Sequence, residues 1–137
     1  MIKKDKKIVP VLSAIIFNEK NEILIARRKP GMSQALKWEF PGGKLKPGES
    51  PEECLKREIK EELGINIQVE KIFHAVNYSY PDKNILLLAY ISKYISGCFN
   101  LKDHSEFRWE IYQKLKNYDF SKADIPVVEK LEKEMAN

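Results

Sequence analysis

Residues 43–65 read GKLKPGESPEECLKREIKEELGI, and they contain a helix whose two ends are marked clearly in the sequence. Ser50 and Glu53 form the Ser-x-x-Glu pattern of a capping box, in which each side chain bonds the backbone N–H of the other residue. Pro51 suits the first helical position, where no backbone donor is needed. Gly64 suits the residue that ends a helix in the left-handed conformation. The stretch therefore predicts a helix between these caps.

The interior of this helix has an apolar face and an acidic face. Apolar side chains recur every four residues, the spacing of one helical face, at Leu55, Ile59 and Leu63. Glu58, Glu61 and Glu62 are spaced i, i+3 and i+4, so their carboxylates share a second face. Like charges at this spacing destabilise a helix by roughly 0.2–0.5 kcal/mol. Such a face is either a solvated surface or a site for a hard divalent cation, and the helix alone leaves both interpretations open.

The regions on both sides of this helix have the patterns of strands. Strand-like runs are predicted at residues 8–17, 22–28, 38–40, 65–77, 84–95 and 107–111. A final helix is expected from Pro126, with Val127, Leu131 and Met135 on its buried face. Strands that flank a central helix, with a second helix at the end, predict an α/β fold in which a mixed β-sheet is sandwiched between α-helices. We expect one domain over residues 1–137.

Composition restricts the classes of function. The chain is 43% hydrophobic and 32% charged, as in ordinary soluble globular proteins. Its longest apolar run, residues 85–91, is too short to span a bilayer. Lysines ahead of the apolar run at residues 8–17 imitate a secretory signal, but Asp5 and Pro10 interrupt this pattern and no small-residue cleavage site follows. We therefore expect a cytoplasmic protein that spans no membrane.

Cysteine usage and net charge agree with this expectation. Cys54 and Cys98 have no CxxC partner and no metal-ligand spacing, so we expect free thiols. The net charge of +4 is too small and too dispersed to predict binding to duplex nucleic acid. It suits the attraction of a polyanionic small molecule. We expect such a molecule as the substrate, with neither nucleic acid nor membrane as a partner, while monomer and homodimer both stay open.

The acidic helix lies within a longer pattern of fixed residues. The spacing is G-x5-E-x7-R-E-U-x-E-E-x-G-U, where U is apolar, and it is matched at every position by Gly43, Glu49, Arg57, Glu58, Ile59, Glu61, Glu62, Gly64 and Ile65. Chance agreement at the seven invariant positions is on the order of 10⁻⁸ per starting residue at ordinary amino-acid usage. By this motif, the Nudix box, the chain is identified as a member of the Nudix hydrolase superfamily.

The residue types in and before the box suit a hard divalent cation. Mg²⁺ prefers octahedral oxygen coordination and keeps several waters, so a few carboxylates together with substrate phosphates suit it. The segment Pro41-Gly42-Gly43 allows the backbone to approach closely, so a carbonyl there can join the ligands. Arg57 can orient the adjacent carboxylates through charge-assisted hydrogen bonds, besides pairing on the surface with Glu53 or Glu61.

Segments outside the box resemble MutT-type nucleoside triphosphate pyrophosphohydrolases over nearly the whole chain. They are Ala26-Arg27-Arg28, Trp38-Glu39-Phe40-Pro41-Gly42-Gly43-Lys44, Tyr80-Pro81-Asp82-Lys83 and Ala123-Asp124-Ile125-Pro126. The resemblance implies a Nudix fold and a Mg²⁺-dependent enzyme, with Mn²⁺ as a substitute metal, in which water attacks within the phosphate chain. The products would be a nucleoside monophosphate and pyrophosphate. The substrates would be oxidised or non-canonical nucleotides such as 8-oxo-dGTP.

The family pattern also implies a role for each matching residue. The metal ligands would be the Gly42 carbonyl, Glu58, Glu61 and Glu62. The catalytic residues would be Glu58, Glu62, Arg57 and Asp103. The substrate-binding residues would be Arg28 at a phosphate, Glu39 and Phe40 in the nucleoside pocket, Lys83 and Asp124.

Three of these positions depart from the family pattern. Asp103 stands where MutT-like proteins often place a Glu as metal ligand or general base, and its shorter reach, with His104 and Glu106 nearby, leaves the general base open. Lys83 stands where Arg is usual and lacks the planar guanidinium. Asp124 stands where the 8-oxoguanine-selective enzyme has Asn. It either reads the base or caps the last helix. An ionised Asp only accepts hydrogen bonds, which favours bases that present amines, such as cytosine.

Other functions compete with this prediction. A CTP or dCTP pyrophosphohydrolase is the first alternative, followed by Nudix hydrolases of ADP-ribose or dinucleoside polyphosphates. A non-catalytic, nucleotide-sensing Nudix module is a further alternative, but such modules usually lose carboxylates of the box, and this chain has all of them. Base and sugar preference are left open by the sequence.

Overall fold

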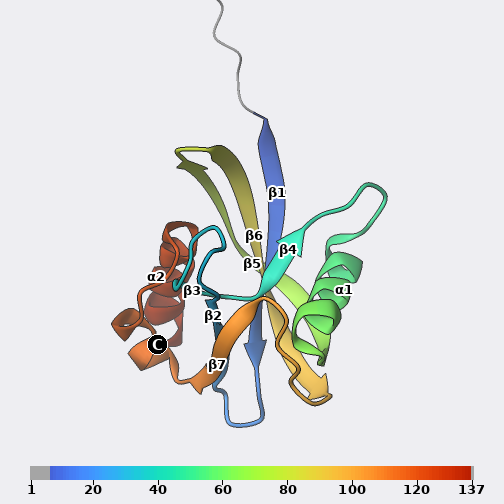
Figure 1. Ribbon diagram of the computed structural model, residues 1–137. Coiled ribbons are helices and arrows are strands. Elements are labelled where there is room, and N and C mark those ends of the chain that lie inside the picture. Colours follow the sequence, from blue (N-terminus) through green and yellow to red (C-terminus); the bar gives the residue numbers. More distant parts are fainter. Residues whose placement is uncertain (1–6, 137) are drawn as a thin grey trace, which may run out of the picture.

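A mixed β-sheet between two helical layers forms the centre of the structure, a computed structural model that describes residues 7–136 (Figure 1). The strands over these residues are β1 (Ile8–Phe17), β2 (Ile23–Arg28), β3 (Trp38–Glu39), β4 (Gly42–Lys44), β5 (Asn66–Tyr80), β6 (Lys83–Ser96) and β7 (His104–Glu110). The helices are α1 (Pro51–Leu63) and α2 (Ile125–Met135), with the 3₁₀ helices η1 (Tyr112–Asn117) and η2 (Lys122–Asp124) before α2. This arrangement confirms the predicted α/β fold.

Strand β1 lies in the middle of the sheet and sets its mixed character. The sheet order is β3-β2-β1-β6-β5, while β4 also pairs with β1 and β7 with β2. Strands β1 and β6 are parallel along their whole length, and the other pairs are antiparallel. Because β6 is the parallel partner of β1, residue 8 lies beside residue 84, which is far along the chain. Because both faces of β1 are covered, its sequence is apolar at nearly every position.

Alternate side chains of β1 point to the two helical layers. Leu12, Ala14 and Ile16 pack with the buried face of α1, whereas Ile15 packs with the core under α2. Figure 1 shows α1 on one side of the sheet and α2 with the 3₁₀ helices on the other. Ser13 points to the α2 side, where it is a polar residue in an apolar row.

Helix α1 has the ends that its sequence predicts. The Ser50 hydroxyl accepts a hydrogen bond from the Glu53 N–H at 3.2 Å, and the Ser50 N–H donates to the Glu53 carboxylate at 3.2 Å. Gly64 ends the helix in the left-handed conformation, with φ of 78°. The apolar face is fully buried at Leu55, Ile59 and Leu63. The capping box and the four-residue spacing are therefore confirmed.

Several boundaries differ from the sequence-based expectation. The segment Gly42–Lys44, for which no strand was predicted, forms β4, because the absence of side chains at the two glycines lets it pair closely with β1. Only two residues separate β5 and β6, since Tyr80 and Lys83 are paired in the register. Strand β7 begins at His104 rather than at residue 107. The 3₁₀ helices η1 and η2 were not expected, because their short segments carry no periodic apolar pattern.

Two smaller features complete the description. Both cysteines carry free thiols, with Cys54 on the buried face of α1 and Cys98 exposed after β6. Burial raises the pKa of the Cys54 thiol to about 11. Within residues 7–136, no helix combines the length and the apolar character needed to cross a bilayer.

The close contact between β4 and β1 yields a stability prediction. A Cβ at Gly42 would collide with the Leu12 backbone carbonyl, so Gly42→Ala should lower the free energy of unfolding by about 3 kcal/mol or more. Gly48→Ala is the matched control, because Gly48 has a positive φ but no atom near the added Cβ. It should cost about 1 kcal/mol. Urea denaturation measures both, and equal losses would contradict the contact.

Candidate active site

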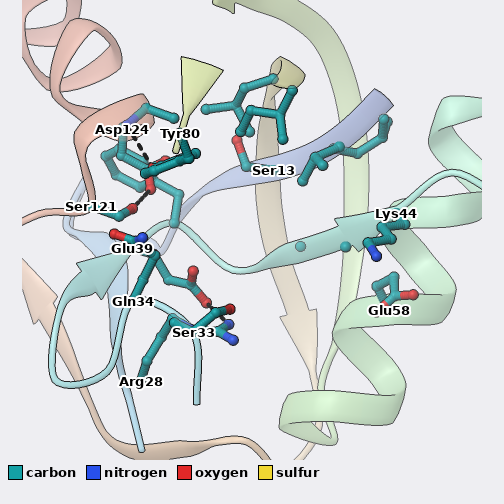
Figure 2. Close-up of a pocket in the computed structure, with 18 of the residues that line it drawn as sticks. Ser13, Arg28, Ser33, Gln34, Glu39, Lys44, Glu58, Tyr80, Ser121 and Asp124 are labelled. Carbon is teal, nitrogen blue, oxygen red and sulfur yellow. Dashed lines mark hydrogen bonds and ion pairs between the residues drawn. The ribbon is translucent and has the colours of Figure 1, made fainter. Parts of the chain in front are cut away.

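A pocket of about 460 Å³ opens where β1, β3, β4, α1, the β5–β6 turn and η2 meet. Figure 2 shows side chains from all of these regions turned toward it. Its lining contains acidic groups at one end and aromatic and hydroxyl groups at the other. The acidic end comprises Gly42, Gly43, Lys44, Glu58 and Glu62, and the other end comprises Phe40, Tyr80, Ser121, Ala123 and Asp124.

The acidic end is built by fitting β4 closely against α1. A Cβ at Gly43 would overlap the Glu58 carboxylate, so glycine leaves room for the Glu58 side chain in its observed position. Gly42 lies beside it and lines the pocket with its backbone. The predicted metal ligands Gly42, Glu58 and Glu62 therefore line one pocket wall. Glu61 does not line the pocket, and its side chain is 53% exposed.

Arg57 organises the carboxylates around the helix. Its Nε and Nη2 donate to the two oxygens of Glu49 at 2.6 and 3.0 Å, and its Nη1 donates to Glu58 at 2.7 Å. A longer contact of 3.3 Å joins Nη1 to Glu61. These hydrogen bonds hold the pKa of Glu49 down to about 2. Arg57 thus links Glu49 of the loop before α1 to two carboxylates of the helix, Glu58 and Glu61, both of which are expected metal ligands.

Glu62 lies among negative charges. Burial raises the pKa of Glu62 to about 8, and the nearby carboxylates of Glu58, Glu39 and Asp103 add to this rise. Within residues 7–136, no three histidine, cysteine or carboxylate side chains stand close enough to form a ready-made metal cluster. A divalent cation nevertheless fits this end, because it would supply the positive charge that Glu62 and its neighbours lack.

The opposite end of the pocket offers hydrogen-bonding groups beside aromatic rings. The Ser121 hydroxyl donates to Asp124 at 2.5 Å, and the Tyr80 hydroxyl accepts a hydrogen bond from the Ala123 N–H at 3.1 Å. Phe40 is buried and packs against Phe120, with 5.3 Å between ring centroids. This end therefore combines a flat apolar wall with a carboxyl group and hydroxyl groups, as a planar heterocycle requires.

Asp124 belongs to the pocket although it occupies the N-cap position of α2. Its side chain makes no capping hydrogen bond and is 95% buried. Burial raises the pKa of Asp124 to about 8, with a further rise from Glu39, while the hydrogen bond from Ser121 opposes the shift. The carboxyl group is therefore mostly protonated at neutral pH and offers both a donor and an acceptor.

Several polar contacts converge on Glu39 of β3 in the pocket. The Glu39 carboxylate contacts Arg28 Nη1 at 3.3 Å and His104 Nε2 at 2.8 Å. Arg28 also donates from Nε to the Ser33 carbonyl at 2.7 Å. The imidazole of His104 is fully buried and does not line the pocket, and its contact holds the Glu39 carboxylate in place. Glu39 acts electrostatically on both Glu62 and Asp124, so it lies between the two ends.

The structure brings most of the expected site residues together. Arg28, Glu39, Phe40, Gly42, Glu58, Glu62, Lys83 and Asp124 all line the pocket. Lys83 lies at the β5–β6 turn, with its ammonium 5.9 Å from the centre of the Tyr80 ring. Asp103 does not line the pocket but lies near enough to Glu62 to raise its pKa.

Other pocket residues were not expected from the sequence. Ser13, Tyr80 and Ser121 line the pocket, and His104 supports it from behind. A polar residue inside the apolar run at residues 8–17 was a signal that could have identified Ser13. Ser121 gave no such signal, because isolated polar residues in loops are common. His104 was noted in the sequence only as a neighbour of Asp103, and its contact with Glu39 comes from the tertiary structure.

Comparisons with known proteins agree with this geometry. The NUDIX domain family model matches residues 7–131. An 8-oxo-dGTP diphosphatase of Escherichia coli (strain K12) is 37% identical over 127 residues, which cover 93% of this chain and 98% of that protein. A CTP pyrophosphohydrolase of the same strain is 33% identical over 123 residues and 90% of each chain.

Solved structures give the same result. The MutT protein from Methanosarcina mazei Go1 superposes with a TM-score of 0.88 at 28% identity, covering 98% of this chain and all of that one. The Escherichia coli ORF135 protein superposes with a TM-score of 0.81 at 31% identity, covering 96% of this chain and 93% of that one. Nudix hydrolases generally depend on a divalent metal ion. The intact box on α1, the fold and these relatives together show that the chain belongs to the Nudix hydrolase family and is of the MutT type.

Proposed function

We propose that this protein is a Mg²⁺-dependent nucleoside triphosphate pyrophosphohydrolase that releases a nucleoside monophosphate and pyrophosphate. One observation carries the proposal: a single pocket joins a carboxylate end to an end of aromatic and hydrogen-bonding groups. A nucleotide has two ends that match those of the pocket: phosphates, which bind a metal ion held by carboxylates, and a planar base, which fits beside aromatic and hydrogen-bonding groups. The proposal includes one Nudix domain over residues 1–137, a cytoplasmic location and oxidised nucleotides such as 8-oxo-dGTP as substrates.

The acidic end would hold the metal and the phosphates. The Gly42 carbonyl, Glu58, Glu61 and Glu62 are the proposed ligands of Mg²⁺, with Mn²⁺ as a substitute. When bound, the metal would neutralise bridging phosphate oxygens and lower the pKa of a water molecule. Arg57 would orient Glu58 and Glu61 through the contacts described above. Two cationic side chains of the lining, Arg28 and Lys44, are placed to bind phosphate oxygens.

The general base is the least determined role at this end. Asp103 is the candidate from the family pattern, and it lies close to Glu62. Its backbone carbonyl accepts a hydrogen bond from the Lys29 N–H at 3.3 Å, which fixes the loop that carries it. A carboxylate in this position could accept the proton of an attacking water without leaving its loop.

The base would lie between Phe40 and the Asp124 carboxyl. A protonated Asp124 presents a donor and an acceptor, as an Asn amide does, and so matches an edge of 8-oxoguanine with one carbonyl and one N–H. An ionised Asp124 would favour cytosine instead, through its exocyclic amine. A cytidine triphosphate pyrophosphohydrolase is therefore the second candidate function, favoured by the carboxyl at this position.

The first prediction concerns the metal site. Glu62→Gln keeps the size of the side chain and removes its charge, so kcat should fall by about 100-fold or more while the fold is kept. Activity should also require Mg²⁺ or Mn²⁺ and disappear with a chelator. The measurement is pyrophosphate release from nucleoside triphosphates. Glu52→Gln, an exposed change on the first turn of α1, is the control and should leave turnover unchanged. Normal turnover by Glu62→Gln would remove this assignment.

The second prediction concerns the position of attack. Chromatography of the products should show nucleoside monophosphate and pyrophosphate, because the MutT relatives suggest attack within the phosphate chain. Nucleoside diphosphate with free orthophosphate would contradict it. Asp103→Asn should lower kcat more than it raises KM if Asp103 accepts the proton.

The third prediction concerns Asp124→Asn. If the Asp124 carboxyl contacts the base, the ratio of kcat/KM between 8-oxo-dGTP and dCTP should change in the variant. In the wild-type protein this ratio should fall as the pH rises through about 8, because the carboxyl loses its donor. In the Asn variant it should depend little on pH. A constant ratio across both proteins and all pH values would show that Asp124 does not contact the base.

Stability supplies an independent check of the same carboxyl. The folded-state pKa of Asp124 is raised from 3.8 to about 8, so the folded protein binds a proton that the unfolded chain releases between these values. Its contribution to stability is thus complete below about pH 4 and is lost as the pH rises to about 8. The melting temperature of the metal-free wild-type protein should therefore fall more steeply over this range than that of Asp124→Asn.

A further inference from the structure

Three buried polar atoms gather around the pocket without a hydrogen-bond partner. Within residues 7–136 these atoms are Ser13 Oγ, His104 Nδ1 and Asp124 Oδ1. Ser13 and Asp124 line the pocket, and the other ring nitrogen of His104 contacts Glu39 in the same pocket. Buried polar groups in folded proteins are nearly always paired, and an unpaired one destabilises the fold. Their concentration at one place indicates groups that a ligand satisfies.

Ser13 is the member of this group that the proposed function does not use. It lies in the centre of β1 and is 98% buried. In the sheet register it is opposite Gly42 of β4, a proposed metal ligand, and beside Ala89 of β6. Its neighbours on the α2 side of β1 are Val11 and Ile15, which offer no polar partner.

Another buried serine shows that an unpaired hydroxyl is not a general property of this sheet. Ser92 of β6 is fully buried, and its hydroxyl donates to the Tyr90 carbonyl at 3.3 Å. Ser92 does not line the pocket. A buried serine on these strands can therefore bond to a backbone carbonyl, whereas Ser13 lines the pocket and its hydroxyl has no hydrogen-bond partner within residues 7–136.

Ser13 lies between the two ends of the pocket. Figure 2 shows it with Tyr80 and Asp124 on one side and Lys44 and Glu58 on the other. A nucleotide whose base lies at the first end and whose phosphates lie at the second would place its sugar at Ser13. The sugar is also the part of a nucleotide that carries hydroxyl groups, which both donate and accept hydrogen bonds as a serine does.

We infer that Ser13 is a specificity-determining residue whose hydroxyl forms a hydrogen bond with a sugar hydroxyl of the bound nucleotide. This inference rests on the proposed function, because it needs a nucleotide in the orientation described. It assigns to this enzyme a direct contact with the ribose or deoxyribose. Discrimination between sugars would then depend on a single hydroxyl at the centre of β1.

Because the Ser13 hydroxyl is unpaired in the free protein, its removal should affect thermal stability and nucleotide binding differently. Removing an unsatisfied buried hydroxyl, as Ser→Ala does, removes no hydrogen bond from the free protein. Ser13→Ala should therefore keep or raise the melting temperature while it weakens nucleotide binding. Ser92→Ala is the matched control, because it removes a hydroxyl that is bonded within the protein. It should lower the melting temperature and leave nucleotide binding unchanged.

The test is calorimetric titration with the products, which does not depend on turnover. Guanosine and cytidine monophosphates are each used in the ribose, 2′-deoxyribose and 2′,3′-dideoxyribose forms, with Mg²⁺ present. For the nucleotide that carries the contacted hydroxyl, Ser13→Ala should weaken binding by about fivefold to tenfold. For the dideoxy form, which lacks both hydroxyls, the loss should be less than twofold. Comparison of the ribose and deoxyribose forms shows which hydroxyl is bound.

Two results would overturn the inference, and they differ from failure of the proposed function. An equal loss for all three sugars would show that Ser13 acts on the base, on the phosphate or only on the structure. Unchanged binding of every nucleotide would show that its hydroxyl has no ligand. If none of the monophosphates binds the wild-type protein, the nucleotide assignment of the pocket fails, and the inference fails with it.

Discussion

The site depends on the close packing of β4 between β1 and α1. Gly42 lies against the backbone of Leu12, and Gly43 lies against the carboxylate of Glu58, so side chains are excluded on both sides of the short strand. This double contact holds the first residues of the Nudix box at the sheet and the acidic face of the helix at the pocket. The two glycines therefore set the spacing of the acidic end.

Charge is distributed unevenly over the acidic end of the pocket formed by β4 and α1. Arg57 binds Glu49 through two nitrogens and also contacts Glu58, so one guanidinium balances the acidic groups on its side of α1. Glu62 is buried beside the carboxylates of Glu58, Glu39 and Asp103, and burial and these charges raise its pKa. In the metal-free protein, repulsion between Glu62 and the nearby carboxylates remains at the place where a cation is expected to bind. The carboxylates of α1 therefore lower the stability of the metal-free protein at the proposed metal site.

Local signals in the sequence were sufficient for some of these features. The caps of α1 and its apolar face follow from Ser50, Gly64 and the spacing of apolar residues, because each of these depends on neighbours within one turn. The acidic face was also predicted, and the box motif identified the family. The mixed sheet followed from the order of strand-like runs around the helix.

Other features depend on distant parts of the chain and could not be predicted. The raised pKa of Asp124 arises from burial and from Glu39, which is 85 residues away in the sequence. Its position before α2 suggested a helix cap equally well, and only the tertiary structure shows the side chain turned away from that role. The same holds for His104 and Ser13, whose importance comes from what surrounds them.

The two ends of the pocket also come from different parts of the chain. The acidic end is concentrated in β4 and α1. Apart from Phe40, which precedes β4, the opposite end draws on Tyr80 from the β5–β6 hairpin and on Ser121 and Asp124 from the segment before α2. Substitutions at the second end need not disturb the helix that carries the carboxylates. Natural variation could thus change which base is accepted while the machinery for cleaving phosphoanhydrides is inherited intact. In a fold divided in this way, related enzymes can keep the same catalytic helix while each one accepts a different nucleotide.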